Sequence, residues 1–279
     1  MKKLLNLAKW GITLGSEPQN FLGASWIKSF LGKVSDKNKR KWALRLVSLS
    51  PHYFLDENNP RYEGLSGDQY LEAAHAHLIE SRKGIYSEIL ENFLAKNAAV
   101  LEYGCGPGYL ASAVAPHVSK IFACDISSGA IACARILNSA ENLRYLSITE
   151  GELEQVEDSQ LDAVYSFAVI QHLTDEVFEL VLKNCRRMLK PGGKIVFHIQ
   201  LKDDVWRTES DWNQDSSVTG KLKYKYGLHC FGRTIEEHKV MVEKTGFGDV
   251  EFVPLQELVG NDQAEAESQA IMTATRLNS

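Results

Sequence analysis

The sequence lacks any apolar run long enough to cross a membrane, because no stretch approaches the ~18 consecutive apolar residues that a span requires. Its five cysteines are odd in number and include no C-x-x-C pair, which disfavours a disulfide framework and favours reduced thiols. Histidine, cysteine and acidic residues do not group at metal-ligand spacing, so no metal is expected. The two lysines near the start are not followed by a sustained apolar core, as a signal peptide requires. We therefore expect a cytoplasmic location and no transmembrane segment.

Charge is distributed unevenly along the 279 residues, whose net charge is −5. The first 50 residues hold ten lysines and arginines against two acids. Such a basic arm can meet an anionic membrane surface or nucleic acid, or it can dock on the acidic body of its own chain. We favour docking within the chain, because charge clusters are usually balanced locally. Nucleic acid is not expected as a partner, since its binding needs a continuous basic surface.

A polar stretch over residues 56–67, punctuated by Asn, Pro and Gly, divides the chain into an N-terminal helical extension, 1–67, and a larger domain, 68–279. Apolar spacing predicts a helix over 68–95. From Ala98 onward, short apolar runs alternate with segments of helical spacing, which is typical of βαβ units and predicts a doubly wound, mostly parallel sheet. The helical segments begin near Tyr109, Ser128, Asp175 and Thr234. The seven predicted strands are Ala99–Tyr103, Lys120–Cys124, Leu143–Ser147, Ala163–Phe167, Lys194–Ile199, Val250–Val253 and Ala270–Ala274.

After the fifth predicted strand comes a long segment, residues 202–232, that is too polar for a core element. Loops of this length in compact domains are usually functional or disordered, and its aromatic content argues against disorder. We predict an aromatic lid insertion over a pocket, with an added surface hairpin as the alternative. The aromatic and histidine residues of the segment are Trp206, Trp212, Tyr224, Tyr226, His229 and Phe231.

The strongest local signal is the run Val100–Gly108, an apolar strand that leads into three alternate glycines and then a helix. Glycine lets the backbone turn tightly and approach a ligand where a side chain would collide. A dinucleotide fingerprint would read G-x-G-x-x-G, but here the third glycine comes one residue early and Tyr109 takes its place. Glu102 further disfavours a pyrophosphate, because a carboxylate beside the ligand suits a cationic amino group.

Asp125 ends the second predicted strand, 21 residues after Gly104. A carboxylate at the carboxyl end of such a strand can accept both hydroxyls of a ribose, as a nucleoside ligand requires. The alternative is a structural role at the start of the next helix, beside Ser127 and Ser128. Both roles can coexist, and the coincidence of two spaced signals favours contact with ribose.

From about Ala98 to Ile199 the chain resembles the class I S-adenosylmethionine-dependent methyltransferases, in particular the type 11 group of ubiquinone-biosynthesis-like small-molecule enzymes. The resemblance covers a little over one third of the chain and implies a Rossmann-like fold with S-adenosylmethionine as cofactor. It rests on four motifs in family order: the glycine run, Ile121–Ser127, Leu161–Ser166, and Arg186–Gly193 with its Pro-Gly-Gly turn.

The resemblance also implies roles for individual residues. The backbone at Gly104, Cys105, Gly106 and Gly108 would hold the methionine and ribose parts of the cofactor, with Glu102 near its amino group. Asp125 would bind the ribose and Ile126 would pack on the adenine. The loop with Glu152 and Leu153 would meet the adenine edge; the family usually has Asp at the position of Glu152, and Glu150 is a substitute. Phe167 would touch the methionine part, and residues 167–172 would line the passage to the acceptor.

Three residues are candidates for the proton transfer that accompanies methylation. His172 can act as a general base, because a neutral imidazole accepts a proton near neutral pH. The alternative is a histidine that caps the helix beginning near Thr174. His229 and Tyr226 are rival candidates, with aromatic packing beneath the lid as their alternative role.

The sequence thus predicts transfer of a methyl group to an oxygen or nitrogen of a small-molecule acceptor. Its rate would come chiefly from orientation of the reactants. Methylation at carbon, a nicotinamide-binding enzyme and a non-catalytic cofactor-binding protein that acts through its basic arm remain alternatives. The acceptor and the oligomeric state stay open.

Overall fold

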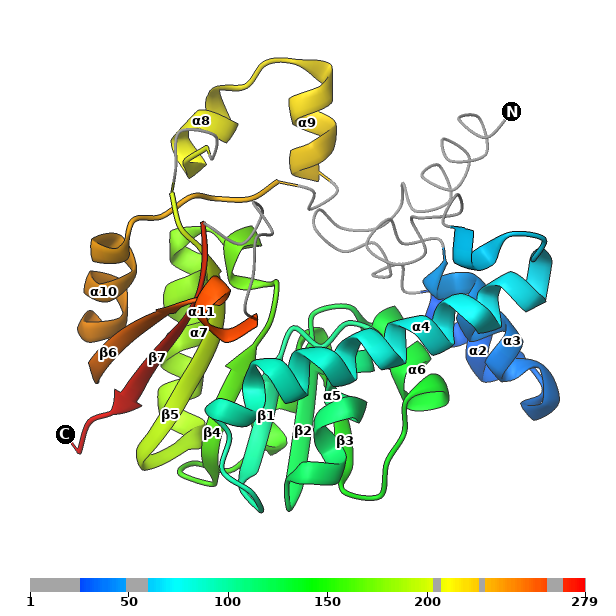
Figure 1. Ribbon diagram of the computed structural model, residues 1–279, viewed down its shortest axis with the longest axis horizontal. Helices are drawn as coiled ribbons and strands as arrows, with labels where there is room; N and C mark the ends of the chain where they lie inside the picture. Colours follow the sequence, from blue (N-terminus) through cyan, green and yellow to red (C-terminus); the bar gives the residue numbers. More distant parts are fainter. Residues whose placement is uncertain (1–25, 49–59, 203–206, 226–228, 260–267, 279) are drawn as a thin grey trace.

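The computed structural model describes residues 26–48, 60–202, 207–225, 229–259 and 268–278, and Figure 1 shows their arrangement. One sheet runs through the molecule, with helices on both faces and further helices at one end and above it. This arrangement confirms the predicted doubly wound α/β class.

The sheet has seven strands in the order β3-β2-β1-β4-β5-β7-β6. Strands β1 to β5 pair in parallel, whereas β7 pairs antiparallel with both β5 and β6. The chain reverses its direction of progress along the sheet between β1 and β4, which is where doubly wound sheets bind ligands. The strand bounds are β1 Ala99–Tyr103, β2 Lys120–Asp125, β3 Leu143–Ser147, β4 Leu161–Ser166, β5 Leu189–Gln200, β6 Phe247–Pro254 and β7 Gln269–Arg276.

Two layers of helices cover the sheet because its strands present apolar side chains on both faces. In β1, Leu101 and Tyr103 join the core on one face, and Val100 joins the core on the other. Buried residues of α7 and α10 complete the first core, and those of α4, α5 and α6 complete the second. The helices span α4 Gly67–Glu88, α5 Tyr109–Val114, α6 Ser128–Leu137, α7 Asp175–Met188 and α10 Ile235–Lys244, and a short helix α11 covers Leu255–Val259.

Side-chain caps fix where these helices begin. Ser127 accepts a hydrogen bond from the backbone N–H of Ala130 at the start of α6, and Thr234 forms a capping box with Glu237 at α10. Thr174 caps α7, so the predicted alternative of His172 as the cap is wrong. α4 also ends at Glu88, earlier than residue 95, because a 3₁₀ turn over Leu90–Asn92 replaces its last turn.

The N-terminal helices α2, Trp26–Lys33, and α3, Asp36–Val47, pack against α6. Their cations pair with acids of the same chain: Arg40 with Glu72, and both Lys41 and Arg45 with Asp68 of α4. The described part of the basic arm therefore docks within the chain, as the charge pattern predicts. Among the described residues, none of the helices combines the length and the apolar character needed to cross a membrane.

The described parts of segment 202–232 include two short helices, α8, Glu209–Gln214, and α9, Val218–Lys225. They stand above the upper edge of the sheet in Figure 1. Trp212 donates a hydrogen bond from its ring N–H to the carbonyl of Cys230, at 2.9 Å. The segment is therefore folded where it is described. Its action as a lid stays a prediction.

Candidate functional site

A cavity of about 600 Å³ opens at the carboxyl ends of β1, β2 and β4. Of the predicted cofactor-binding residues, it brings together seven, and the predicted base His172 also lies in its wall. The seven are Glu102, Gly104, Cys105, Gly106, Asp125, Ile126 and Phe167. Gly108, Glu152, Leu153 and His229 are not among the lining residues, and Tyr226 lies outside the described residues.

The glycine turn between β1 and α5 is shaped by contacts within the protein. Gly104 has a φ of +82°, and a Cβ there would lie 2.6 Å from the Val169 side chain. The amides of Gly104 and Cys105 both donate to the carbonyl of Cys124, at 2.8 and 3.0 Å. Gly108 directly precedes α5 at a φ of +80°, and a Cβ there would collide with the Tyr145 ring and hydroxyl. Packing within the protein thus requires glycine at both positions, and Gly104 also lines the cavity.

An acidic and a basic side chain, Glu102 and Arg82, line the same cavity. Glu102 is 3% exposed, accepts a hydrogen bond from the Tyr165 hydroxyl at 3.3 Å, and lines the cavity together with Arg82 of α4. Burial raises the pKa of Glu102 to about 8, although the Tyr165 hydrogen bond and the Arg82 charge act in the opposite direction. A carboxyl and a guanidinium in one wall fit the ammonium and carboxylate of an amino acid.

Asp125 has the predicted structural role beside Ser127, and its predicted contact with ribose stays a prediction. One carboxylate oxygen accepts the amide of Gly106 and the other accepts the amide of Ser127, both at 2.8 Å. Burial raises the pKa of Asp125, and these two amide donors oppose the rise. A carboxylate has about four lone-pair positions, so two donors leave capacity for the hydroxyls of a ribose.

The rest of the cavity wall is mostly apolar. Ile126 is 43% exposed on one side, although large aliphatic side chains are usually buried. α7 presents Val177 and Leu180, which are 43% and 57% exposed. Such a wall suits a flat, weakly polar ring system. The other Leu, Ile, Val and Phe residues that line the cavity are Leu110, Ile148, Phe167, Val169, Leu173 and Val181.

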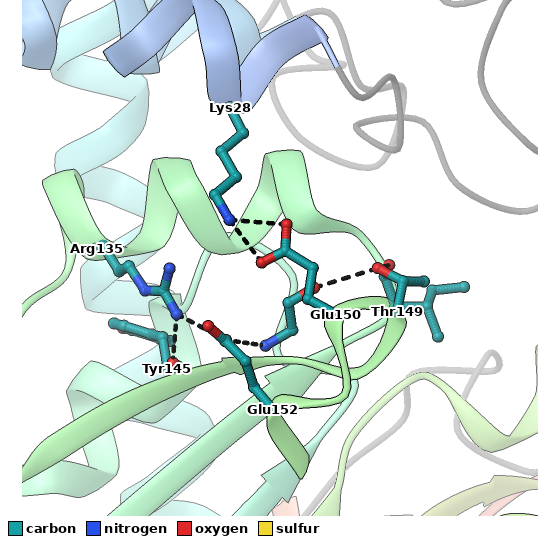
Figure 2. A network of polar contacts seen from close by, with 8 residues as sticks. Lys28, Arg135, Tyr145, Thr149, Glu150 and Glu152 are labelled. Carbon is teal, nitrogen blue, oxygen red and sulfur yellow. Dashed lines mark hydrogen bonds and ion pairs between the residues drawn. The ribbon is translucent and has the colours of Figure 1, made fainter. Parts of the chain in front are cut away.

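The predicted adenine-edge loop is held by ion pairs on its outer side (Figure 2). Glu152 accepts the Ser147 amide at 2.6 Å and pairs with Arg135 at 2.8 Å. Glu150 points toward Lys28 of α2 and pairs with it at 2.6 Å, which ties the N-terminal extension to this loop. In this conformation both carboxylates are engaged within the protein, and Leu153 is buried in the core. An adenine contact from this loop stays a prediction.

The imidazole rings of His172 and His229 each contact the backbone carbonyl of the other residue. The His172 Nδ1 lies 2.5 Å from the His229 carbonyl, and the His229 Nε2 lies 3.2 Å from the His172 carbonyl. A carbonyl only accepts, so the proton of His172 sits on Nδ1 and Nε2 is the basic atom of the ring. Burial lowers the pKa of His172, which keeps the ring neutral.

His229 itself is fully buried and lies among aromatic rings. It stacks on Tyr224 with ring centroids 4.7 Å apart and contacts Phe231 and Trp212. This environment matches the predicted alternative of aromatic packing. His229 is therefore placed to orient His172 and away from the cavity itself.

Two parts of the cavity were not predicted from the sequence: Arg82 of α4, and the residues Val177 and Leu180 of α7. Arg82 lies on a long helix 20 residues before Glu102 in the chain, and no local motif marks it; the packing of α4 across the sheet brings it to the cavity. The sequence gives only a weak indication of Val177 and Leu180: they are apolar residues on a helix whose buried face is already complete without them. Among the described residues, no cluster of His, Cys, Asp or Glu could hold a metal ion.

Comparison with known proteins finds a family model for part of the chain. Residues 101–197, from β1 into β5, match a family model described as methyltransferase domain. The fold agrees, because an S-adenosylmethionine-dependent methyltransferase from Mesorhizobium loti aligns over 71% of this chain and all of its own, with 17% identity and a TM-score of 0.50.

Curated relatives match a stretch of similar length. The ubiquinone biosynthesis O-methyltransferase of Pseudomonas fluorescens is 33% identical over 100 residues, which are 35% of this chain and 42% of the relative. The enzyme of the same name from Alkalilimnicola ehrlichii is 31% identical, over 35% of this chain and 40% of its own length. The chain thus spans less than half the length of the curated relatives that it matches.

Proposed function

We propose that this protein binds S-adenosylmethionine in the cavity and transfers its methyl group to an oxygen or nitrogen of a small-molecule acceptor. The observation that carries the proposal is the set of charges within one cavity of a methyltransferase domain. Glu102 and Arg82 fit the amino-acid end of the cofactor, and Asp125 fits its ribose. When bound, the cofactor supplies an activated methyl group on a sulfonium, which is already a good leaving group.

The residues of the chain would bind and orient the reactants. The bare backbone at Gly104 and Gly106 permits close approach, Glu102 and Arg82 fix the zwitterionic end, and Ile126 offers a face to the adenine. Orientation of this kind supplies much of the rate when the leaving group is good.

His172 is the proposed general base. Its Nδ1–H is donated to the His229 carbonyl, so its Nε2 can take the proton that the acceptor oxygen or nitrogen loses. The apolar wall of α7 favours an acceptor that is uncharged or partly apolar. A nucleic-acid acceptor is disfavoured, because most of the described cations of the N-terminal helices are paired with acids. We expect the protein to act in the cytoplasm.

A methyl-transfer assay with a panel of phenols, catechols and amines tests this function. We expect S-adenosylhomocysteine to form only when an accepted compound is present, with the added mass of one methyl group on that compound. Binding of the cofactor without turnover across the panel would instead favour the non-catalytic binding protein. Methylation at a carbon atom would contradict the proposed acceptor class.

A further inference from the structure

His198 is a buried polar residue of β5 that the proposed reaction does not use. It is 4% exposed, and its ring lies on Phe167 with centroids 4.4 Å apart and planes 25° apart. Its Nε2 is 2.8 Å from the Gln269 side-chain oxygen, and its Nδ1 is 3.2 Å from the Ala168 amide nitrogen. Both neighbours are satisfied when Nε2 carries the proton and Nδ1 accepts. Burial lowers the pKa of His198, which favours this neutral form.

The backbone amide that donates to His198 belongs to a residue with an unfavourable backbone conformation. Ala168 has a φ of +59°, in the left-handed region that residues with a Cβ seldom adopt. Such conformations persist only where the surroundings fix them. His198 contacts this turn twice, because its Nδ1 accepts from the Ala168 amide and its ring stacks on Phe167.

The same turn forms a wall of the cofactor cavity. Phe167, Ala168 and Val169 all line it, and Val169 presses against Gly104 so closely that a Cβ at Gly104 would lie 2.6 Å from its side chain. A change in the backbone at Ala168 would therefore move the side of the cavity that faces the glycine turn.

We propose that His198 is a positioning residue, which holds Ala168 in its left-handed conformation and thereby sets the wall of the cavity at the glycine turn. It acts through Phe167, Ala168 and Val169, without lining the cavity itself. The ligand in this proposal rests on the proposed function, whereas the contact with Ala168 does not.

Two amide substitutions separate the two ring nitrogens. His198→Asn places an oxygen where Nδ1 lies and can still accept from Ala168. His198→Gln places its amide near the position of Nε2 and loses the acceptor for Ala168. We expect His198→Gln to weaken binding of S-adenosylhomocysteine about tenfold, as loss of one buried hydrogen bond allows, and His198→Asn to stay within about threefold of the wild type. Val196→Ala, on the same strand face, controls for general loss of stability.

Amide hydrogen exchange of the unliganded protein gives a readout without cofactor. The Ala168 amide should exchange about tenfold faster in His198→Gln, and near the wild-type rate in His198→Asn and Val196→Ala. Glycine adopts positive φ readily, so in an Ala168→Gly background His198→Gln should change affinity less than about threefold.

Several results would overturn the proposal. If His198→Asn and His198→Gln lose affinity equally, and each loss follows the fall in melting temperature, then His198 only fills space in the core. An undiminished effect of His198→Gln in the Ala168→Gly background would remove Ala168 as the link. If the wild type binds no S-adenosylhomocysteine while exchange at Ala168 still separates the two variants, the proposed function is wrong and the positioning role stands.

Discussion

Glu102 leads to a prediction about protons that accompany cofactor binding. Burial raises its pKa to about 8, so at pH 7 about nine tenths of this carboxyl group is protonated in the unliganded protein. A bound ammonium favours the ionised carboxylate, and binding should then release about 0.9 proton from Glu102 at pH 7. The amino group of the ligand, with a pKa of about 7.7–8.0, takes up only about 0.1–0.2 proton at this pH.

The sign of the proton exchange should invert near pH 8. At pH 9 the carboxyl group is already ionised, while the ligand amine is mostly neutral and must gain about 0.9 proton to pair with it. Calorimetric titration in buffers with different ionisation enthalpies measures the number directly. We expect net release at pH 7 and net uptake at pH 9 for the wild type.

Glu102→Gln is the matched variant. It should abolish the release at pH 7 and weaken the uptake at pH 9, because no carboxylate remains to pair with the ammonium. It should also bind S-adenosylhomocysteine about tenfold more weakly, as loss of a charged hydrogen bond implies. The affinity for 5′-methylthioadenosine, which lacks the amino-acid end, should change little. Equal proton exchange in the wild type and the variant would refute the placement of the ammonium beside Glu102.

Four further predictions follow from individual residues. Because the folded state raises the pKa of Glu102, the free energy of unfolding of the unliganded wild type should fall as pH rises from about 4.5 to 8, and urea titrations of Glu102→Gln should show a weaker fall. Arg82→Met should weaken S-adenosylhomocysteine about tenfold or more in calorimetry while sparing 5′-methylthioadenosine; equal losses for both would contradict a carboxylate contact. His172→Ala should lower kcat about 10²-fold or more with little change in cofactor affinity, and an unchanged rate would exclude it as the base. Gly104→Ala should lower both melting temperature and affinity, because its Cβ would lie 2.6 Å from the Val169 side chain; wild-type values would show that the turn can yield.

The fold could be predicted largely from local patterns. All seven strands overlap the short apolar runs that predict them, although β5 and β6 begin earlier than their runs. The buried parallel strands β1 to β5 need such runs, and the glycine turn and the Pro-Gly-Gly turn mark the end of β1 and the start of the continuously paired part of β5. The end of α4 was harder to predict. Its apolar spacing continues through Leu90, and the switch to a 3₁₀ turn depends on packing against the sheet.

Some residues of the site could also be predicted from the sequence, and others could not. Glu102 and Asp125 follow strands whose carboxyl ends meet at one edge, so spacing along the chain locates them. Arg82 reaches the cavity only through the course of α4 over the sheet. The role of His229 also needed the structure, because its carbonyl accepts from the His172 ring while its own ring reaches the His172 backbone carbonyl. No sequence pattern reports which backbone group a side chain will find.

Parallel calorimetric titrations of the purified wild type with S-adenosylmethionine, S-adenosylhomocysteine and NAD test the central claim most directly. We predict saturable binding of both sulfur nucleosides at one site and no binding of NAD. Binding of NAD without either sulfur nucleoside would contradict the assignment of Glu102, Arg82 and Asp125 to an S-adenosylmethionine site.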